Sequence, residues 1–366
     1  MQAGPVIAVD ARLVGYAAGI ARYATLLIEA LRQLDGPEHY VVLRGRRAAR
    51  CTGRLCLTPP HHRLERWTLP LELLPPGRKP DLLHSIDHVA PAWGPWRSVV
   101  TLHDLAFVLY PETHTAASRI YYAAAGESAR KAARVIAVSQ RTASDAVRLL
   151  GVDPARVRVI HNAADPRFGP RPPEELAPLG GRLGFDPRTP YILFVGTLEP
   201  RKNVPLVFDA LAILRRQIDV QLLVVGGRGW IGETIHAAHA RSGIGEAAHF
   251  LGWLDQSELA VLYSHARVFV LPSVYEGFGL PVLEAMACGA PVVCSNAGPL
   301  PEVAGDAAVL LPPEGPAAWA EAIGRVVTDQ RLAAELRARG MSRARAFSWQ
   351  LAARATREVY REALLA

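Results

Sequence analysis

The stretch V274-Y-E-G-F-G-L-P-V-L-E-A-M-A-C-G-A-P-V-V-C294 combines a glycine loop, a short helix and a buried strand. Pro281 suits the first helical position, where its missing N–H is harmless, and Gly289 suits the C-terminal cap. We therefore expect a helix over Val282–Cys288, followed by a strand over residues 290–294. The free N–H groups and partial positive charge of the helix start would face the loop, which predicts an anion site, such as one for a diphosphate.

Two carboxylates frame this loop. Glu276 precedes it and Glu284 follows eight residues later, in the expected first helical turn. Each carboxylate can accept hydrogen bonds from a pair of hydroxyls. As alternatives, Glu284 would merely complement the helix dipole and Glu276 would be a solvated loop charge. The loop between them, whose glycines allow a ligand close to the backbone, consists of Gly277, Phe278, Gly279 and Leu280.

The pattern E-G-F-G-L-P-x-L-E-A-M-A-x-G-x-P-V-V resembles the donor-site signature of the retaining nucleotide-sugar glycosyltransferases, in particular family 4. This resemblance implies that Glu284 holds the ribose hydroxyls of the nucleotide and that Glu276 holds the hydroxyls of the transferred sugar. It implies that the loop backbone binds the sugar and the diphosphate. The implied fold class is α/β, namely GT-B, with two Rossmann-like domains whose parallel sheets face across a cleft.

Length and composition agree with two ordinary domains, because the chain has 366 residues. The first apolar run, Val6–Val9, is too short for a signal peptide, and no apolar stretch reaches the ~18–20 residues of a spanning helix. We therefore expect a cytoplasmic protein. Between residues 41 and 74 arginine, histidine and proline predominate. We expect a mobile, basic, acceptor-side region there, which either meets anionic lipid head groups or pyrophosphate carriers at the inner face of the cell membrane or is plain surface.

Lysine is scarce, with three among 41 basic residues. Lys202 lies in F194-V-G-T-L-E-P-R-K-N203, after a predicted strand over Tyr191–Val195 and before a helix. Parallel α/β sheets bind ligands at that place. Arg201 and Lys202 facing a diphosphate at ~4 Å would each contribute about 4 kcal/mol of gross attraction. The alternative is a surface pair of cations near a helix start.

The family usually carries an arginine directly after the glycine of this segment, and that arginine grips the β-phosphate together with the lysine. Here Gly196 is followed by Thr197. The resemblance therefore transfers to Lys202 directly and to Arg201 only as a substitute. Q221-L-L-V-V-G-G227 ends another strand in two glycines, and we expect Gly227 beside the nucleotide. F250-L-G-W-L-D255 resembles the segment whose backbone reads the base, without choosing between uracil and guanine.

The beginning of the chain is Rossmann-like, with a strand over Val6–Asp10, a glycine segment and a helix over Ile20–Leu31. A nicotinamide dehydrogenase would begin in the same way. Gly15 and Gly19 are four residues apart, however, so the G-x-G-x-x-G fingerprint is absent and that class is disfavoured. G19-I-A-R-Y23 is similar to the family's first loop, where Gly19 gives the donor and acceptor room. An ordinary strand-to-helix turn explains this segment equally well.

Polar side chains end two further predicted strands, in D81-L-L-H-S-I-D87 and R97-S-V-V-T-L-H-D-L105. An α/β domain keeps its site at such carboxyl ends. The second segment resembles the family's acceptor-domain cleft, which implies that His103 lies against the reactive end of the sugar, with Asp104 as its orienter. A buried structural histidine is the alternative.

The domain boundaries follow from composition. The proline- and glycine-rich segment 169–187 predicts a linker between an acceptor-binding domain, 1–168, and a donor-binding domain, 188–345. Residues 346–366 would form the helix that, in GT-B proteins, crosses back to the first domain. The helical tail before it is expected to break near Gly340.

The family resemblance implies a retaining hexosyltransferase, and we expect it to work without metal or other cofactor. It would move a hexose from a nucleoside diphosphate sugar, with GDP-mannose favoured over a UDP-sugar, to a hydroxyl of a growing glycan or lipid-linked acceptor, as in lipopolysaccharide and other polysaccharide biosynthesis. We expect no nucleic-acid partner. Two alternatives stay open, a non-catalytic nucleotide-sugar-binding partner of a glycan assembly complex and an epimerase or phosphorylase on the same fold. The expected catalytic residues are His103, Glu276, Lys202 and Arg201.

Overall fold

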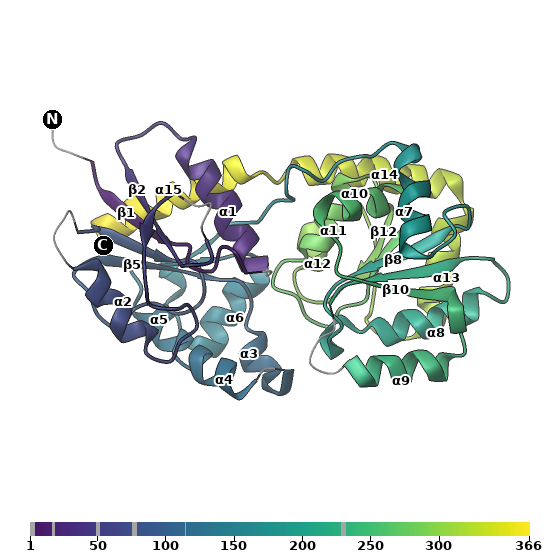
Figure 1. Ribbon diagram of the computed structural model, residues 1–366, viewed down its shortest axis with the longest axis horizontal. Coiled ribbons are helices and arrows are strands. Elements are labelled where there is room, and N and C mark those ends of the chain that lie inside the picture. Colours follow the sequence, from purple (N-terminus) through teal and green to yellow (C-terminus); the bar gives the residue numbers. More distant parts are fainter. Residues whose placement is uncertain (1–3, 17–18, 49–51, 75–78, 114, 228–231) are drawn as a thin grey trace. The chain divides into compact units, whose positions relative to one another are not determined.

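The computed structural model describes residues 4–16, 19–48, 52–74, 79–113, 115–227 and 232–366. The chain divides into two compact units, Met1–Asn162 with Ser348–Ala366, and Ala163–Phe347. Each unit is a parallel sheet with helices on both faces (Figure 1). The alternation of strands and helices along the sequence produces this arrangement, and the predicted α/β class is confirmed.

The sheet of the first unit has the strand order β3-β2-β1-β4-β5-β6-β7. Its strands are β1 (Val6–Asp10), β2 (His39–Arg44), β3 (Arg54–Leu55), β4 (Leu82–Ser85), β5 (Arg97–Leu102), β6 (Arg134–Ala137) and β7 (Val157–Val159). The order reverses between β1 and β4, where Asp10 pairs with Ser85. In open α/β sheets, ligands bind outside the carboxyl ends of the strands at such a reversal.

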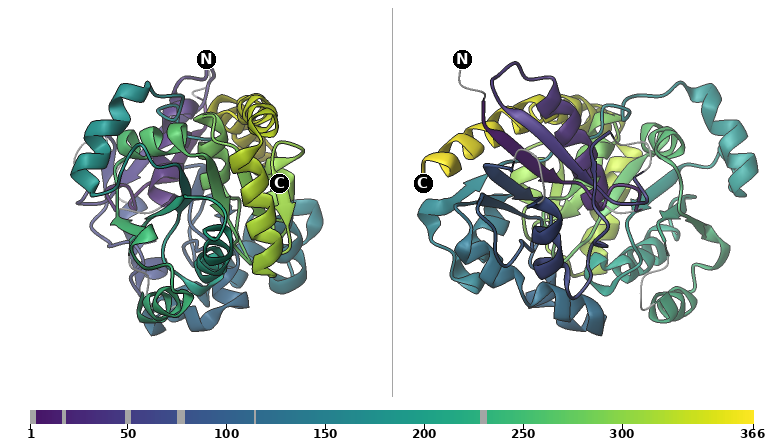
Figure 2. Two further views of the ribbon diagram at one scale, coloured as in Figure 1. Left: turned by 90° about the vertical axis from the view of Figure 1, so that its right-hand side faces the viewer. Right: turned by 60° about the vertical axis from the view of Figure 1, so that its left-hand side comes forward.

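Helices cover both faces of this sheet. They are α1 (Gly19–Arg32), α2 (Glu65–Leu73), α3 (Ala106–Leu109), α4 (Ala116–Tyr122), α5 (Ala125–Lys131), α6 (Gln140–Leu150) and α15 (Trp349–Leu365). The last helix, α15, begins after the N-cap Ser348 and packs against α1 and β4 to β6. Figure 2 shows it in yellow beside the purple first elements of the chain.

Helix α2 differs from the sequence expectation, because the region between residues 41 and 74 was predicted to be mobile. Leu69 and Leu73 of α2 are buried in a core cluster with Ala8, Leu43 and Leu83 from three strands. This apolar anchor fixes the helix on the sheet. The basic composition of the segment drew attention away from Leu69 and Leu73, which are sufficient to order it.

The sheet of the second unit has the strand order β10-β9-β8-β11-β12-β13. Its strands are β8 (Tyr191–Val195), β9 (Gln221–Val225), β10 (Ala248–Gly252), β11 (Val268–Leu271), β12 (Val292–Ser295) and β13 (Val309–Leu311). Every residue of β8, β9, β11 and β12 is buried, as expected for central parallel strands covered on both faces. The order reverses between β8 and β11, so the second unit repeats the switch point of the first.

The helices of the second unit are α7 (Leu176–Leu183), α8 (Val204–Leu214), α9 (Gly232–Ser242), α10 (Gln256–His265), α11 (Leu280–Ala287), α12 (Leu300–Ala304), α13 (Pro316–Thr328) and α14 (Gln330–Arg345). The segment 169–187 thus contains a helix and clusters with this unit. The expected break near Gly340 is wrong, because α14 continues through it. A Cβ at Gly340 would lie 3.2 Å from Cγ of Met286, so this glycine lets α14 pack closely on α11. In the described part of the chain, no helix combines the length and apolarity needed to cross a bilayer.

Candidate active site

The glycine loop leads into α11 at the carboxyl edge of the second sheet. Gly279 is the N-cap, with a left-handed φ of 100°. A Cβ at this position would stand 2.5 Å from Cδ2 of Leu300, so only glycine fits. The helix begins at Leu280, two residues before the predicted start, and Pro281 lies in its first turn. Gly289 adopts φ of 81° just beyond its end, as the C-terminal cap signal predicted.

A buried ion pair joins the ends of β8 and β11. Lys202 Nζ lies 2.6 Å from Glu276 Oε1, and both side chains are less than 10% exposed. Ser273 Oγ donates to the same carboxylate oxygen at 2.7 Å. Arg201 Nη1 lies 3.4 Å from Glu276 Oε2 and donates to the Tyr275 carbonyl. The structure therefore brings Glu276 together with two cations that lie 74 and 75 positions earlier in the sequence.

The charges at this site are interdependent. Burial alone would raise the pKa of Glu276, but Lys202 and Arg201 outweigh it and hold that pKa below its usual value. Burial lowers the pKa of Lys202, and Glu276 opposes that effect only in part. Glu199 also pairs with Arg201, with its Oε2 2.8 Å from Nε, so the two cations face two carboxylates. An anionic ligand would relieve the repulsion between Arg201 and Lys202.

Glu284 lies in the second turn of α11, not in the first turn as predicted, because the helix begins earlier. Its side chain is buried, and Tyr263 Oη donates to Oε2 at 3.3 Å. A carboxylate placed only to complement the helix dipole would be exposed in the first turn. This position disfavours the dipole interpretation.

The glycines at the ends of β8 and β9 differ in their constraints. A Cβ on Gly226 would stand 2.0 Å from the carbonyl oxygen of Gly196, so these two strand ends approach too closely for any other residue. A Cβ on Gly227 would meet nothing within 4 Å. Thr197 is exposed next to Gly196. The sequence prediction chose Gly227, whereas Gly226 is the position that requires a glycine.

In the first unit, His103 ends β5. Its Nε2–H donates to the Ile86 carbonyl at 2.7 Å, which fixes the tautomer and leaves Nδ1 as an acceptor. Burial and the neighbouring His88 lower the pKa of His103 to about 4, so its imidazole is neutral at pH 7. The ring packs edge to face against Tyr23 at 4.7 Å. Gly19, one helical turn before Tyr23, has open space where a Cβ would lie.

The expected role of Asp104 is wrong. Its carboxylate accepts the Ala106 N–H at 2.9 Å, and its carbonyl contacts His88, so Ile86 is the residue that orients His103. His84 also has a structural role. It is fully buried between Tyr360 Oη and Thr101 Oγ1, both at 2.7 Å, and burial lowers its pKa to about 3.

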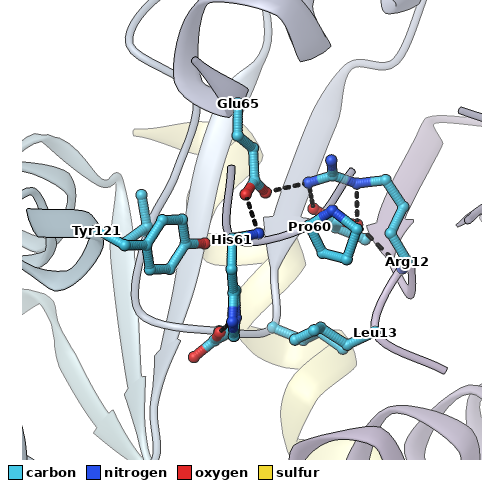
Figure 3. Close-up of a pocket in the computed structure, with 10 residues that line it drawn as sticks. Arg12, Leu13, Pro60, His61, Glu65 and Tyr121 are labelled. Carbon is cyan, nitrogen blue, oxygen red and sulfur yellow. Dashed lines mark hydrogen bonds and ion pairs between the residues drawn. The ribbon is translucent and has the colours of Figure 1, made fainter. Parts of the chain in front are cut away.

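A polar pocket that the sequence did not predict lies at the switch point between β1 and β4 (Figure 3). Arg12 is buried there and is held by the carboxylates of Asp10, at 2.6 Å, and Glu65. Its Nη1 donates to the Thr58 carbonyl at 3.0 Å. Arg12 comes from the end of β1 and Glu65 from α2, so the helix closes the pocket.

His61 forms another wall of this pocket. Its Nε2 lies 2.5 Å from Oδ2 of the buried Asp87, and its N–H donates to Glu65 at 2.6 Å. The backbone φ is 61°, a left-handed conformation that a non-glycine residue rarely adopts. Its ring packs 4.6 Å from that of Tyr121, which faces it in Figure 3. A strained, oriented and 40% exposed imidazole in a pocket is typical of a ligand-binding residue.

Metal and thiol chemistry gain no candidate residues here. Within the ranges that the structure describes, His, Cys, Asp and Glu side chains form no group of three that would hold a metal ion. Cys56, Cys288 and Cys294 are buried free thiols. Cys51 lies outside the described residues.

Comparison with known proteins supports the interpretation of both units. Residues 17–168 match the family described as Glycosyltransferase Family 4, and residues 181–345 match Glycosyl transferases group 1. The O-antigen chain mannosyltransferase B of Escherichia coli is 35% identical over 258 residues, which cover 69% of this chain and 67% of that protein. The D-inositol 3-phosphate glycosyltransferase of Streptomyces bingchenggensis is 36% identical over 243 residues, and the match spans about half of its length, 53%.

Solved structures share the fold along the whole chain. Sucrose-phosphate synthase from Thermosynechococcus elongatus superimposes with a TM-score of 0.77 at 24% identity and covers 98% of both chains. Anabaena HepE in complex with UDP-glucose gives a TM-score of 0.76 at 20% identity, over 97% of this chain and 99% of that one. The two parallel sheets are therefore those of a GT-B glycosyltransferase. The chain belongs to glycosyltransferase family 4, and the group 1 match lies in its second unit.

The sequence missed the pocket residues for identifiable reasons. Arg12 and Asp10 follow a strand, which is a signal for a site, but their partner Glu65 lies in a segment that was expected to be mobile. His61 and His62 are adjacent, but the sequence places no third metal ligand at a suitable spacing from them. Asp87, the partner of His61, was noted at a strand end, but nothing in the sequence linked the two residues.

Proposed function

We propose that this chain is a retaining hexosyltransferase that uses a nucleoside diphosphate sugar. The observation that carries the proposal is the buried Lys202–Glu276 pair with Arg201, beside the glycine loop and the start of α11. Donated N–H groups at a helix start and two adjacent cations are suited to a diphosphate. GDP-mannose is the preferred donor in this proposal, because the E. coli relative is named as a mannosyltransferase.

Each donor-site residue then has a role. Glu284 accepts hydrogen bonds from the ribose hydroxyls, and Glu276 accepts them from the sugar. The backbone of residues 277–280 holds the sugar and the diphosphate, with Gly196, Thr197 and Gly227 lining the nucleotide's path. Lys202 exchanges part of its interaction with Glu276 for the β-phosphate. Arg201 supplies the second cation, in place of the arginine that the family carries at Thr197.

The acceptor is a hydroxyl of a glycan carried on a lipid, and it lies at the mouth of the polar pocket of the first unit, whose interior has room for only about one water. Asp10 and the His61–Asp87 pair offer acceptors for sugar hydroxyls, while the ring of Tyr121 offers an apolar face. His103 lies against the sugar near Gly19, with its neutral Nδ1 as a hydrogen-bond acceptor. A neutral imidazole avoids adding positive charge where an oxocarbenium ion develops.

In the transfer, the bond between the anomeric carbon and the diphosphate oxygen breaks, and the acceptor oxygen bonds to that carbon from the same face. The hydroxyl proton passes to the departing diphosphate. Arg201, Lys202 and the α11 N-terminus stabilise the negative charge on that leaving group, so the reaction needs no metal. Electrostatic stabilisation of this kind is commonly the largest single contribution to catalysis.

Calorimetric titration without divalent metal tests the proposal. Guanosine, uridine and adenosine diphosphate sugars are titrated into the wild type, Glu284→Ala and the control Glu321→Ala, which removes an exposed glutamate from α13. We expect one donor to bind the wild type and the control, and to bind Glu284→Ala about 10-fold to 100-fold more weakly, as for a lost charged hydrogen bond. Equal binding by Glu284→Ala would refute the site. Donor binding without transfer to any acceptor would favour the non-catalytic partner.

A further inference from the structure

The net charge of this chain is confined to one segment. Residues 44–79 hold nine of the 41 basic residues and only two of the 34 acidic ones, so the segment carries +7, the net charge of the whole chain. The other residues hold 32 of each sign. An anionic partner is therefore attracted to this segment and not to the protein as a whole.

Both acidic residues of the segment are occupied internally. Glu65 is paired with Arg12 in the pocket. The carboxylate of Glu72 accepts the N–H groups of Leu57, at 2.6 Å, and Thr58, at 2.7 Å. Arg63 and Lys79, in contrast, are exposed. The outward electrostatic character of the segment is therefore positive.

Large apolar side chains are exposed on the same segment. Among the described residues, eleven large hydrophobic side chains are exposed, and five of them fall within 17 residues of sequence. They are Leu55, Leu57, Leu64, Trp67 and Leu71, with between 44% and 59% of their surface accessible. We call these five residues the α2 patch. The hydrogen bond from Leu57 to Glu72 holds the preceding strand beside the end of α2 that carries Leu71.

The helix geometry explains how the patch stays exposed. Leu64, Trp67 and Leu71 are spaced by three and four residues and share one face of α2, which Figure 1 shows in dark blue at the margin of the first unit. Glu65, Leu69 and Leu73 lie on the opposite face and are buried. Core packing therefore fixes the helix and cannot cover its outer face. A short helix that is apolar on both faces needs a second apolar environment.

We propose that the α2 patch docks on a bilayer surface that contains anionic phospholipid. Tryptophan and leucine side chains enter the interfacial region, and exposed arginine and lysine attract anionic head groups. The buried face of the same helix carries Glu65 to the pocket, so docking would present the pocket to a glycan on a lipid carrier. This inference rests on the proposed lipid-linked acceptor.

Vesicle co-sedimentation of the full chain tests the docking. We expect binding to phosphatidylcholine vesicles that contain about one-third phosphatidylglycerol to exceed binding to phosphatidylcholine alone by about 10-fold or more, and to weaken in about 0.5 M salt. Trp67→Ser/Leu71→Ser should weaken partitioning about 10-fold. The control Ile120→Ser/Leu351→Ser removes two similarly exposed apolar side chains elsewhere in the first unit and should bind like the wild type.

A matched pair of double variants tests the contribution of charge to vesicle binding. Arg63→Gln/Lys79→Gln should reduce binding to the anionic vesicles by about 10-fold. Arg188→Gln/Arg331→Gln lowers the net charge equally, at residues that are about 90% exposed in the second unit, and should leave binding unchanged. An equal loss in both variants would mean that only total charge matters, and it would overturn the assignment to the α2 patch.

Two further outcomes would overturn the proposal. One is wild-type binding that does not distinguish the two vesicle compositions. The other is a patch that mediates self-association, seen as a change in sedimentation velocity for Trp67→Ser/Leu71→Ser with no change in vesicle binding. Donor calorimetry separates this inference from the proposed function. Vesicle binding by a wild type that binds no donor would refute the transferase assignment only, whereas donor binding without vesicle binding would refute the docking only.

Discussion

The two units place their polar clusters at the same topological position but build them differently. In the second unit, Lys202 follows β8 and Glu276 follows β11. In the first unit, Arg12 follows β1 and Asp87 follows β4, which are the equivalent strands at the reversal of strand order. In the second cluster, the adjacent cations Arg201 and Lys202 share Glu276, and Arg201 also pairs with Glu199. In the first, the one arginine is fully engaged by two carboxylates.

This difference indicates which ligand each unit suits. Two adjacent cations beside the start of α11 favour an anion in the second unit, such as a diphosphate. In the first unit, the carboxylates of Asp10, Glu65 and Asp87 outnumber the one arginine, so no uncompensated cation is left to attract an anion, and a hydroxyl-rich ligand is favoured. The fold thus provides the position, and the side chains at that position distinguish the ligand classes that the two units suit.

The largest expected effect comes from Lys202→Ala, which breaks the cluster of the second unit. Loss of one stabilising group at the leaving diphosphate should lower turnover about 100-fold to 1,000-fold. Glu276 would also stay buried with a weaker partner, so the free energy of unfolding should fall by about 3–5 kcal/mol. Steady-state transfer and denaturant unfolding measure the two effects. Lys131→Ala, which breaks an exposed pair with Glu127, is the control and should keep full activity.

Arg12→Ala breaks the cluster of the first unit and should cost a similar amount of stability without weakening donor binding. Asp10 and Glu65 would lose their shared partner in a buried site, at a cost of about 3–5 kcal/mol of stability. Donor affinity, measured by calorimetry, should not change. Arg12→Lys keeps the charge but not the forked geometry, so it should recover part of the lost stability. A loss of donor affinity in a folded Arg12→Ala protein would contradict the separate roles of the two clusters.

The sequence predicted the second cluster far better than the first. Each candidate residue of the second cluster lies in a contiguous sequence motif. The strands Tyr191–Val195 and Val6–Asp10, one from each unit, were predicted with the boundaries that the structure has. Strand and helix existence followed from apolar periodicity. The pocket of the first unit depends on Glu65, whose helix is ordered by two leucines inside a basic segment. No local sequence signal shows that a helix more than 50 residues after Arg12 will close the pocket.

The sequence also did not predict which side chains contact one another. Asp104 was the nearest carboxylate to His103 in sequence, but the carbonyl of Ile86 orients that histidine. Lys202 and Arg201 were expected to face a diphosphate alone, whereas Glu276 engages both cations. Sequence position indicates which strand end a residue occupies, and packing decides which neighbour it contacts.

The helix starts at the two switch points offer a smaller test. Gly279 has φ of 100° and no room for a Cβ, so Gly279→Ala should lose about 1–3 kcal/mol of stability and shift the start of α11. Gly19, at the start of α1, has open space at its Cβ. Gly19→Ala should therefore change the stability by less than about 1 kcal/mol. Thermal unfolding of both variants measures the two stability losses. Equal losses would refute the claim that Gly279 is more constrained than Gly19.

The last test concerns pH and separates the units by their titrating groups. His103 has a pKa lowered from 6.5 to about 4, so the folded state resists a proton that the unfolded chain binds. Its contribution to stability is complete above pH 6.5 and is lost as the pH falls towards 4, by about 1.4 kcal/mol per pH unit at most. Glu276, whose pKa is lowered from 4.5, begins to lose its contribution only below pH 4.5.

His103→Gln keeps an N–H donor for Ile86 without the titration, so its unfolding free energy should fall less steeply between pH 6.5 and 4.5. His84 and His88 are present in both proteins and cancel in the difference. Parallel slopes for the wild type and His103→Gln would mean that folding does not lower the pKa of His103, and they would contradict an imidazole that is held neutral by its burial.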